Sequence, residues 1–278
     1  MVGGLDTKGL CLKLSALAGP FFFERSLKIA PFGINKNRFL LSWPRDSLGA
    51  GASAKFLRLL ADMGFAEEAI EALDQHQRQA RFIHFGFEGS DHEPKMKAYL
   101  EFDPDPTQHA LRYLAVKSAP APGADEFVLS EYRQLAYQTP DQRRVDDLAI
   151  MTLAPLQALE TTLIEIFWTD PARSDVLQVR DLGTRRLSFD WNVARSEVTP
   201  RQHTVLLDTA RNFSEIYHAP SVVEPALADV HKLTHIAVGL SKAEHPFLTL
   251  YHDAEEWRDV YEFADHWIER SGLAQSAD

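Results

Sequence analysis

Residues 81–102 read RFIHFGFEGSDHEPKMKAYLEF, and this stretch decides the fold class. Apolar and polar residues alternate in both of its halves, Arg81–Glu88 and Lys95–Phe102, and a polar segment with Gly89 and Pro94 separates them. Alternation with a period of two is typical of β-strands, and Gly and Pro between two such runs are typical of a turn. The stretch therefore predicts an antiparallel hairpin.

The second strand of this hairpin carries charged and aromatic side chains on a single face. Because side chains alternate between the two faces of a strand, Lys95, Lys97, Tyr99 and Glu101 point the same way. If that face lines the interior of a closed sheet, a ligand inside can contact Lys97 and Tyr99. The alternative is a surface strand whose lysines are solvated.

Four further pairs of strand-like runs are spread along the chain. They cover a hairpin within Leu27–Trp43, Asp147–Leu153 with Thr161–Trp168, Arg186–Val193 with His203–Asp208, and Lys232–Leu240 with Pro246–His252. The run Arg186–Val193 alternates strictly between polar and apolar residues, which predicts a polar interior face and an apolar face covered by helices.

Helices are predicted between and after these pairs. Apolar residues recur at helical spacing from Ser53, a candidate N-cap, to Leu73. The other predicted helices are Thr107–Val116, Glu126–Tyr137, Ser174–Leu182, Phe213–Leu227 and a C-terminal helix that is capped by Asp253 and extends to Ile268.

Two strands followed by a helix, repeated about five times, form the predicted order of elements. This order lacks the single alternation of strand and helix that a parallel Rossmann or TIM sheet shows. Two α+β architectures fit it. The sheet is either closed into a barrel with helices outside and a polar lumen, or open with helices on one face.

Composition limits the partners and the compartment. The 278 residues contain 29 Lys and Arg against 40 Asp and Glu, a net charge of -11 that argues against nucleic acid as the main partner. The single cysteine, Cys11, predicts a reducing compartment, with the cytoplasm as the default. The chain also lacks a run of eighteen uncharged apolar residues, so we expect no membrane span.

Three stretches resemble the ABBA-type prenyltransferases. They are Arg38–Leu41 on the first hairpin, Lys95–Tyr99 on the second, and Gly239–Ala243 leading into Pro246–His252 on the fifth. The resemblance extends from Leu27 to Ile268 and is nearest to the peptide prenyltransferases of cyanobactin pathways.

The resemblance implies a fold and an activity. The implied fold is α+β: a single domain over residues 1–278, with about ten antiparallel strands in five hairpins closed into a barrel and helices outside. The implied activity transfers a dimethylallyl or geranyl group from its diphosphate to a peptide side chain or aromatic acceptor in natural-product biosynthesis. A small-molecule phenol or indole prenyltransferase is one alternative, and a noncatalytic barrel that binds an apolar ligand or a peptide is another.

Prenyl transfer needs cationic donors for the departing diphosphate. The resemblance implies this role for Lys97. Arg38 lies at the matching place on the first hairpin, and its planar fork suits a pair of diphosphate oxygens. We expect Arg186 and Lys232 to bind the diphosphate as well. No metal ligand set is predicted, although Mg²⁺ bound through the diphosphate itself is compatible with this site.

The reaction also needs aromatic faces that shield an allyl cation from water, and a group that orients or deprotonates the acceptor. The resemblance implies that Tyr99 lies over the prenyl chain, and Tyr251 matches an aromatic position on the last strand. Glu165 is predicted as the catalytic carboxylate, because a lone Glu in an apolar strand should face the lumen. An edge-strand Glu165 in water and an ordinary buried Tyr251 are the alternatives. Leu40 stands where many relatives carry an acidic residue, and this difference weakens the case for an indole substrate.

Overall fold

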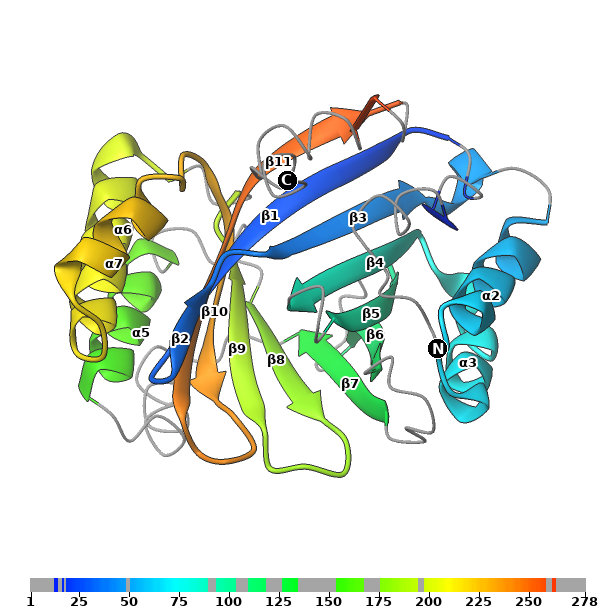
Figure 1. Ribbon diagram of the computed structural model, residues 1–278, viewed down its shortest axis with the longest axis horizontal. Coiled ribbons are helices and arrows are strands. Elements are labelled where there is room, and N and C mark those ends of the chain that lie inside the picture. Colours follow the sequence, from blue (N-terminus) through cyan, green and yellow to red (C-terminus); the bar gives the residue numbers. More distant parts are fainter. Residues whose placement is uncertain are drawn as a thin grey trace, which may run out of the picture.

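Ten antiparallel strands close into a barrel in the computed structural model (Figure 1), which describes residues 13–14, 17, 19–48, 51–89, 94–103, 110–118, 127–134, 154–167, 176–194, 198–258 and 262–263. The strands are β1 (Phe21–Ala30), β2 (Gly33–Asn35), β3 (Arg38–Pro44), β4 (Phe82–Gly89), β5 (Pro94–Glu101), β6 (Leu111–Ser118), β7 (Phe127–Gln134), β8 (Val176–Asp181), β9 (Leu187–Asn192), β10 (Leu233–Leu240) and β11 (Pro246–Trp257). Their hydrogen-bonded order is β11-β10-β9-β8-β7-β6-β5-β4-β3-β1, and β11 pairs with β1 to close the ring, while the short β2 pairs with β1 outside it. The predicted closed barrel is confirmed, and the open sheet is excluded.

Strict alternation along the strands divides the barrel wall into two faces. On β4, the outward side chains Ile83 and Phe85 are fully buried under helices, while His84 and Glu88 face the lumen. Burying each outward aromatic or aliphatic side chain contributes about 1.5–3 kcal/mol, so this register is strongly favoured over a one-residue slip. The lumen therefore receives the polar and aromatic residues.

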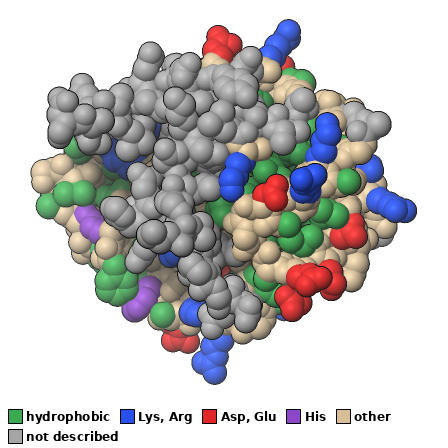
Figure 2. Space-filling model, turned by 45° about the vertical axis from the view of Figure 1, so that its right-hand side comes forward, with side chains coloured by type: hydrophobic (Ala, Val, Ile, Leu, Met, Phe, Trp, Pro, Cys, Tyr) green, Lys and Arg blue, Asp and Glu red, His purple; other side chains and the backbone are tan. Residues whose placement is uncertain are grey.

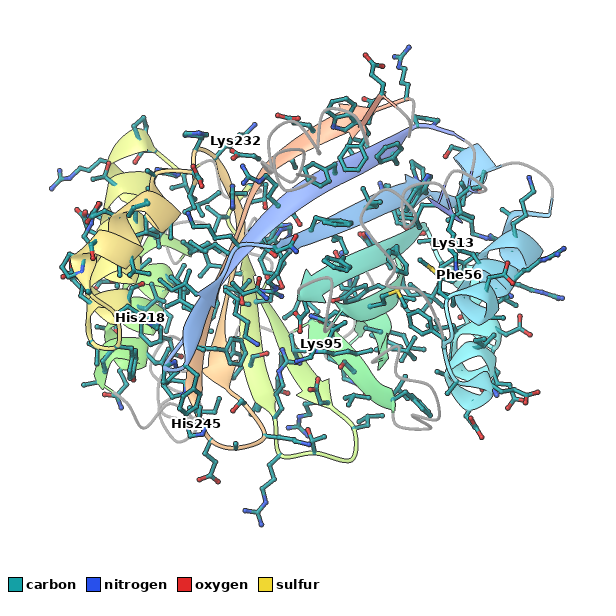
Figure 3. All side chains as sticks on the ribbon, in the orientation of Figure 1. Lys13, Phe56, Lys95, His218, Lys232 and His245 are labelled. Carbon is teal, nitrogen blue, oxygen red and sulfur yellow. The ribbon has the colours of Figure 1, made fainter. Side chains whose placement is uncertain are left out.

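Helices cover the outside of the barrel in two groups (Figure 1). One group is α2 (Ala52–Asp62) and α3 (Glu67–Asp74), with the 3-10 turns η1 (Arg45–Leu48) and η2 (Gln77–Gln79) beside it. Phe56 of α2 (Figure 3) is fully buried in the core that these helices share with the barrel wall. The other group is α5 (Ala154–Phe167), α6 (Pro200–Glu215) and α7 (Pro220–Leu227), which packs against β1, β9, β10 and β11. None of the helices in the described ranges has the length and hydropathy needed to cross a bilayer.

Three segments predicted as helices are strands. Thr107–Val116 overlaps β6, Glu126–Tyr137 contains β7, and Ser174–Leu182 contains β8. In β6 the apolar residues Leu111 and Leu114 are also three apart, as in a helix, but pairing with β5 and β7 decides the conformation. Local spacing cannot report such long-range partners.

Two segments predicted as strands are helices. Thr161–Trp168 overlaps α5, whose fully buried Leu156, Leu159 and Leu163 lie on one helical face. His203–Asp208 lies inside α6, which begins with a capping box between Thr199 and Gln202. The predicted strand Asp147–Leu153 lies outside the described residues.

Other boundaries differ as well. The predicted helix from Ser53 is two helices, because Gly64 at φ 80 interrupts it between α2 and α3. Likewise, Phe213–Leu227 covers the end of α6 and all of α7. The predicted C-terminal helix cannot begin at Asp253, because β11 continues to Trp257 and pairs there with Phe21 of β1.

Candidate active site

Five basic side chains converge on one layer inside the barrel, with two carboxylates among them. Each comes from a different strand or the residue beside one, so only the closed barrel brings them together. We call these residues the cationic layer: Lys28, Arg38, Lys97, Lys117, Arg186, Glu88 and Asp181. On the part of the outer face that Figure 2 shows in colour, basic and acidic side chains are both present.

Glu88 on β4 joins three of the cations. Its Oε2 lies 3.0 Å from Arg38 Nη2 and 2.8 Å from Lys97 Nζ, and its Oε1 lies 2.6 Å from Lys117 Nζ. Burial alone would raise the pKa of Glu88, but the neighbouring cations outweigh it and hold the pKa well below its usual value. Glu88 is therefore an anion that fixes the positions of the three cations.

Arg186 pairs with Asp181, the other carboxylate of the layer. Its Nη1 lies 2.6 Å from Asp181 Oδ1, and its guanidinium carbon lies 5.3 Å from the centre of the Phe247 ring. Lys28 Nζ lies 4.9 Å from the centre of the same ring. Arg38 Nη1 donates a hydrogen bond of 3.4 Å to Thr249 Oγ1, which joins the last described strand to the layer.

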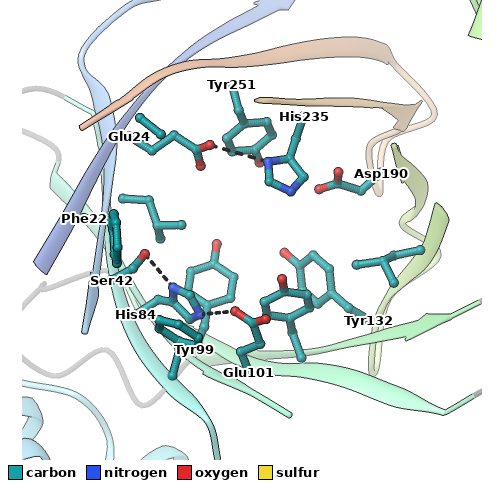
Figure 4. A pocket seen from close by; sticks show the side chains of 15 residues that line it. Phe22, Glu24, Ser42, His84, Tyr99, Glu101, Tyr132, Asp190, His235 and Tyr251 are labelled. Carbon is teal, nitrogen blue, oxygen red and sulfur yellow. Dashed lines mark hydrogen bonds and ion pairs between the residues drawn. The ribbon is translucent and has the colours of Figure 1, made fainter. Parts of the chain in front are cut away.

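A cavity of about 280 Å³ lies inside the barrel (Figure 4), and its lining residues Tyr99 and Tyr251 are close enough to Arg38 of the cationic layer to interact with its charge. On β3 and β5, lumen-facing residues of the layer, Arg38 and Lys97, are followed on the same face by cavity residues Leu40 and Tyr99. The cavity is lined by Phe22, Glu24, Leu40, Ser42, Phe82, His84, Tyr99, Glu101, Tyr113, Tyr132, Leu177, Asp190, His235, Tyr251 and Ala254.

Four tyrosines supply most of the aromatic lining. The ring centres of Tyr99 and Tyr132 lie 6.0 Å apart, and those of Tyr113 and Tyr132 lie 5.6 Å apart. Burial raises the pKa of Tyr132 to about 12, and it also raises the pKa of Tyr99 and of Tyr251 above its usual value. These side chains stay neutral at physiological pH and line the cavity with aromatic rings.

Two histidine–carboxylate pairs stand on the cavity wall (Figure 4). His235 Nδ1 lies 3.4 Å from Glu24 Oε1, and Thr234 donates a hydrogen bond to the same oxygen. Burial raises the pKa of Glu24, but hydrogen bonds and the charge of His235 outweigh this and hold the pKa below its usual value. In the second pair, His84 Nε2 lies 3.1 Å from Glu101 Oε2.

The structure brings together most of the predicted site residues. Arg38, Lys97 and Arg186 lie in the cationic layer, while Tyr99 and Tyr251 line the adjoining cavity. Their roles in binding remain predictions, but the shared location that those roles require is present. The alternative that Lys97 is a solvated lysine on a surface strand is excluded, because its side chain is only 18% exposed.

Two predicted site residues lie elsewhere. Glu165 is exposed on α5, outside the barrel, so the prediction that it faces the lumen is wrong. It was based on a strand that is in fact a helix. Lys232 precedes β10 and is exposed, and its backbone N–H donates to Asp253 Oδ1, so it does not belong to the cationic layer.

Several lumen residues were not predicted. Tyr113 on β6 and Tyr132 on β7 belong to segments predicted as helices, and Lys117 follows the first of these segments directly, so their shared face was not visible. Alternation in the run from Tyr113 to Lys117 is the signal that identifies them once it is read as a strand. His84 and Glu88 lie on a correctly predicted strand, and only their direction toward the lumen was missed.

The described residues offer no resident metal site, since they contain no group of three or more His, Cys, Asp or Glu side chains placed to hold a metal ion. Both carboxylates of the cationic layer are already engaged by cations. The layer therefore suits an anion better than a metal ion.

Comparison with known proteins identifies the fold. No protein-family model matches the chain, and no curated protein sequence matches it. Among solved structures, 5-dimethylallyltryptophan synthase from Streptomyces coelicolor is similar with a TM-score of 0.57 at 12% identity, covering 86% of this chain and 81% of that one. The NotF prenyltransferase is similar with a TM-score of 0.52 at 11% identity over 83% and 80%, and AnaPT from Neosartorya fischeri with 0.50 at 11% over 83% and 77%. At these identities the likeness shows a shared architecture, the ABBA prenyltransferase barrel.

Proposed function

We propose that this protein is a cytoplasmic prenyltransferase that moves an isoprenyl group from its diphosphate to an aromatic acceptor. One observation carries the proposal: a buried cationic layer adjoins a tyrosine-lined cavity within one lumen. The names of the similar structures support it, because one is a 5-dimethylallyltryptophan synthase and another is NotF in complex with brevianamide F and DMSPP.

The cationic layer is matched in charge to a diphosphate. With all groups ionised, its five basic residues and two carboxylates carry a formal charge of +3. An isoprenyl diphosphate carries roughly two to three negative charges near neutral pH. When the C–O bond to the allyl carbon breaks, its electron pair leaves with the diphosphate, and the fixed cations stabilise that charge.

The tyrosine-lined cavity is suited to the allyl cation left behind. Aromatic ring faces attract cations, and neutral tyrosines do so without adding a nucleophilic phenolate. Tyr99 is the first lumen-facing residue after Lys97 on β5, so it lies beside the position of the breaking bond. We assign the shield to Tyr99, Tyr132 and Tyr251, with Tyr113 packed behind Tyr132.

The acceptor shares the cavity with the prenyl chain. A volume of about 280 Å³ admits a prenyl group and one aromatic ring system, whether that ring belongs to a free small molecule or to a peptide side chain. Peptide modification in natural-product biosynthesis and small-molecule prenylation are both compatible with this volume. The acceptor panel in the assay below separates them.

We expect transfer to proceed without a protein-bound metal ion. The cationic layer already supplies the positive charge that Mg²⁺ provides in other diphosphate sites. Any Mg²⁺ would enter as a counter-ion held by the oxygens of the diphosphate.

Binding of the diphosphate should weaken above about pH 8. Burial, opposed by Glu88 and reinforced by the nearby cations, lowers the pKa of Lys28 to about 8. A bound anion favours the charged lysine, so the KM for the diphosphate stays flat below that pH and rises above it by up to roughly tenfold per unit. Burial also lowers the pKa of Lys97 well below its usual value, so both lysines contribute to the rise in KM. Steady-state assays between pH 6.5 and 9.5 measure this rise, and Lys28→Met should reduce it. A rise in KM with pH that is identical in Lys28→Met and in the wild type would contradict the assignment.

Calorimetry and a transfer assay test the proposed function. The purified protein should bind dimethylallyl and geranyl diphosphate, and it should form a prenylated product with at least one member of a panel of tryptophan, 1-naphthol and short Trp- or Tyr-containing peptides. EDTA should leave product formation intact. Diphosphate binding with no product from any acceptor would support a noncatalytic barrel, and no diphosphate binding would overturn the proposal.

A further inference from the structure

We propose that Ser42, His84 and Glu101 form a proton relay that removes the proton from the acceptor during prenyl transfer. The inference rests on the proposed function, and it assigns the catalytic base that Glu165 does not supply. The observation behind it is a chain of hydrogen bonds on the wall of the cavity, from Ser42 through His84 to Glu101 (Figure 4).

Three adjacent strands place the relay residues. Ser42 on β3 pairs in register with His84 on β4, and Glu101 lies at the end of β5, the next strand. Ser42 Oγ lies 2.7 Å from His84 Nδ1, and His84 Nε2 lies 3.1 Å from Glu101 Oε2. All three residues line the cavity, and His84 and Glu101 are only 6% and 8% exposed.

The order of the groups fixes the direction of proton flow. An ionised carboxylate only accepts, so the proton of neutral His84 lies on Nε2 and is donated to Glu101. Nδ1 then accepts the hydrogen bond from the Ser42 hydroxyl, and the Ser42 oxygen keeps lone pairs for a donor in the cavity. The acceptor's O–H or N–H is the donor that the proposed reaction brings there.

The step balances in atoms and charge. The allyl carbon forms a bond to the acceptor atom as its bond to the diphosphate oxygen breaks, and the diphosphate leaves with that electron pair. The acceptor's proton passes to Ser42 Oγ while the Ser42 proton passes to His84 Nδ1. The resulting imidazolium is stabilised by Glu101, and it returns its proton to water after the product leaves.

Neighbouring groups support a cationic His84 in this step. Glu24 faces it from β1, Tyr99 and Glu101 from β5, and Tyr113 from β6, where its ring centre lies 5.8 Å from that of His84. The surrounding charge is negative or neutral, and these tyrosines are aromatic rings that favour a cation. In the other pair, Glu24 and His235, the hydroxyl of Thr234 donates to the carboxylate of Glu24 and not to the imidazole.

Variants of the relay test the proposal in the transfer assay. Ser42→Ala and His84→Gln should lower kcat by roughly 10²- to 10⁴-fold with an unchanged Kd for the diphosphate, because the relay does not touch it. Ser42→Thr, which keeps the hydroxyl, should retain kcat within a few-fold, and Ser214→Ala, which removes a buried hydroxyl of α6 outside the barrel, should behave as wild type.

The outcomes separate this proposal from the function on which it rests. A wild-type kcat in Ser42→Ala or in His84→Gln would overturn the relay and leave prenyl transfer standing. No product from the wild-type protein would overturn both. If His84→Gln fails to fold by circular dichroism, Ser42→Ala and Ser42→Thr decide the question, because their difference is a single hydroxyl.

Discussion

Replacing Lys97 with Met lowers kcat/KM for the isoprenyl diphosphate by roughly 10²- to 10³-fold. Truncating one partner of a buried, hydrogen-bonded charge pair costs about 2–5 kcal/mol, and every 1.4 kcal/mol is about tenfold. Lys97 Nζ is 2.8 Å from Glu88 and adjoins the cavity through Tyr99, so its charge lies where we propose that the diphosphate binds. Steady-state kinetics with dimethylallyl diphosphate, and calorimetry for Kd, measure the effect.

Lys232→Met is the matched control for this variant. Lys232 was predicted to bind the diphosphate but is exposed outside the lumen, so its loss should change kcat/KM by less than about threefold. Equal effects of the two substitutions would contradict the cationic layer as the diphosphate site.

Replacing Glu88 with Gln destabilises the free protein by about 3–5 kcal/mol. Removing one partner of a buried ion pair leaves an uncompensated charge, and Glu88 compensates three of them. Inorganic pyrophosphate supplies the missing negative charge, so it should stabilise Glu88→Gln more than it stabilises the wild type. Urea unfolding with and without pyrophosphate measures both changes.

Glu71→Gln on α3 is the control, because Glu71 is exposed and its loss should change the free energy of unfolding by less than about 0.5 kcal/mol. A Glu88→Gln protein that is as stable as the wild type, or that gains no more from pyrophosphate, would show that the layer is not organised around Glu88.

Local patterns carried the fold prediction wherever a strand and its partner are neighbours in sequence. The hairpin of β4 and β5 combines alternation with a turn, and it was predicted almost to the residue. In β6, Leu111, Leu114 and Ala115 fit a helix as well as a strand, and only pairing with β5 and β7 resolves the ambiguity. The repeated order of hairpins fitted a closed barrel and an open sheet equally, and the resemblance to the ABBA-type prenyltransferases pointed to the barrel even though several of its strands were misplaced.

The same limit applies to the site. Lys97 and Arg38 were found because each lies on a strand with a readable alternation. Lys117 was missed with its strand, and Glu165 was misassigned because the run around it alternates like a strand within a helix. Which charged side chains form ion pairs depends on how the strands pair in three dimensions. The ion pairs of Glu88 with three cations could therefore not be predicted from the sequence.

Closure of the barrel through β1 and β11 has a consequence for synthesis on the ribosome. Leu27 of β1 pairs with Leu250 of β11, so the first strand must wait for more than two hundred residues of chain before its partner emerges. Contacts so distant in sequence form slowly, and until they form, β1 is an unpaired edge that can join another chain. Nascent chains stalled before β11 would therefore aggregate through this edge. They would also lack a complete site, because Thr249 and Tyr251 lie on β11.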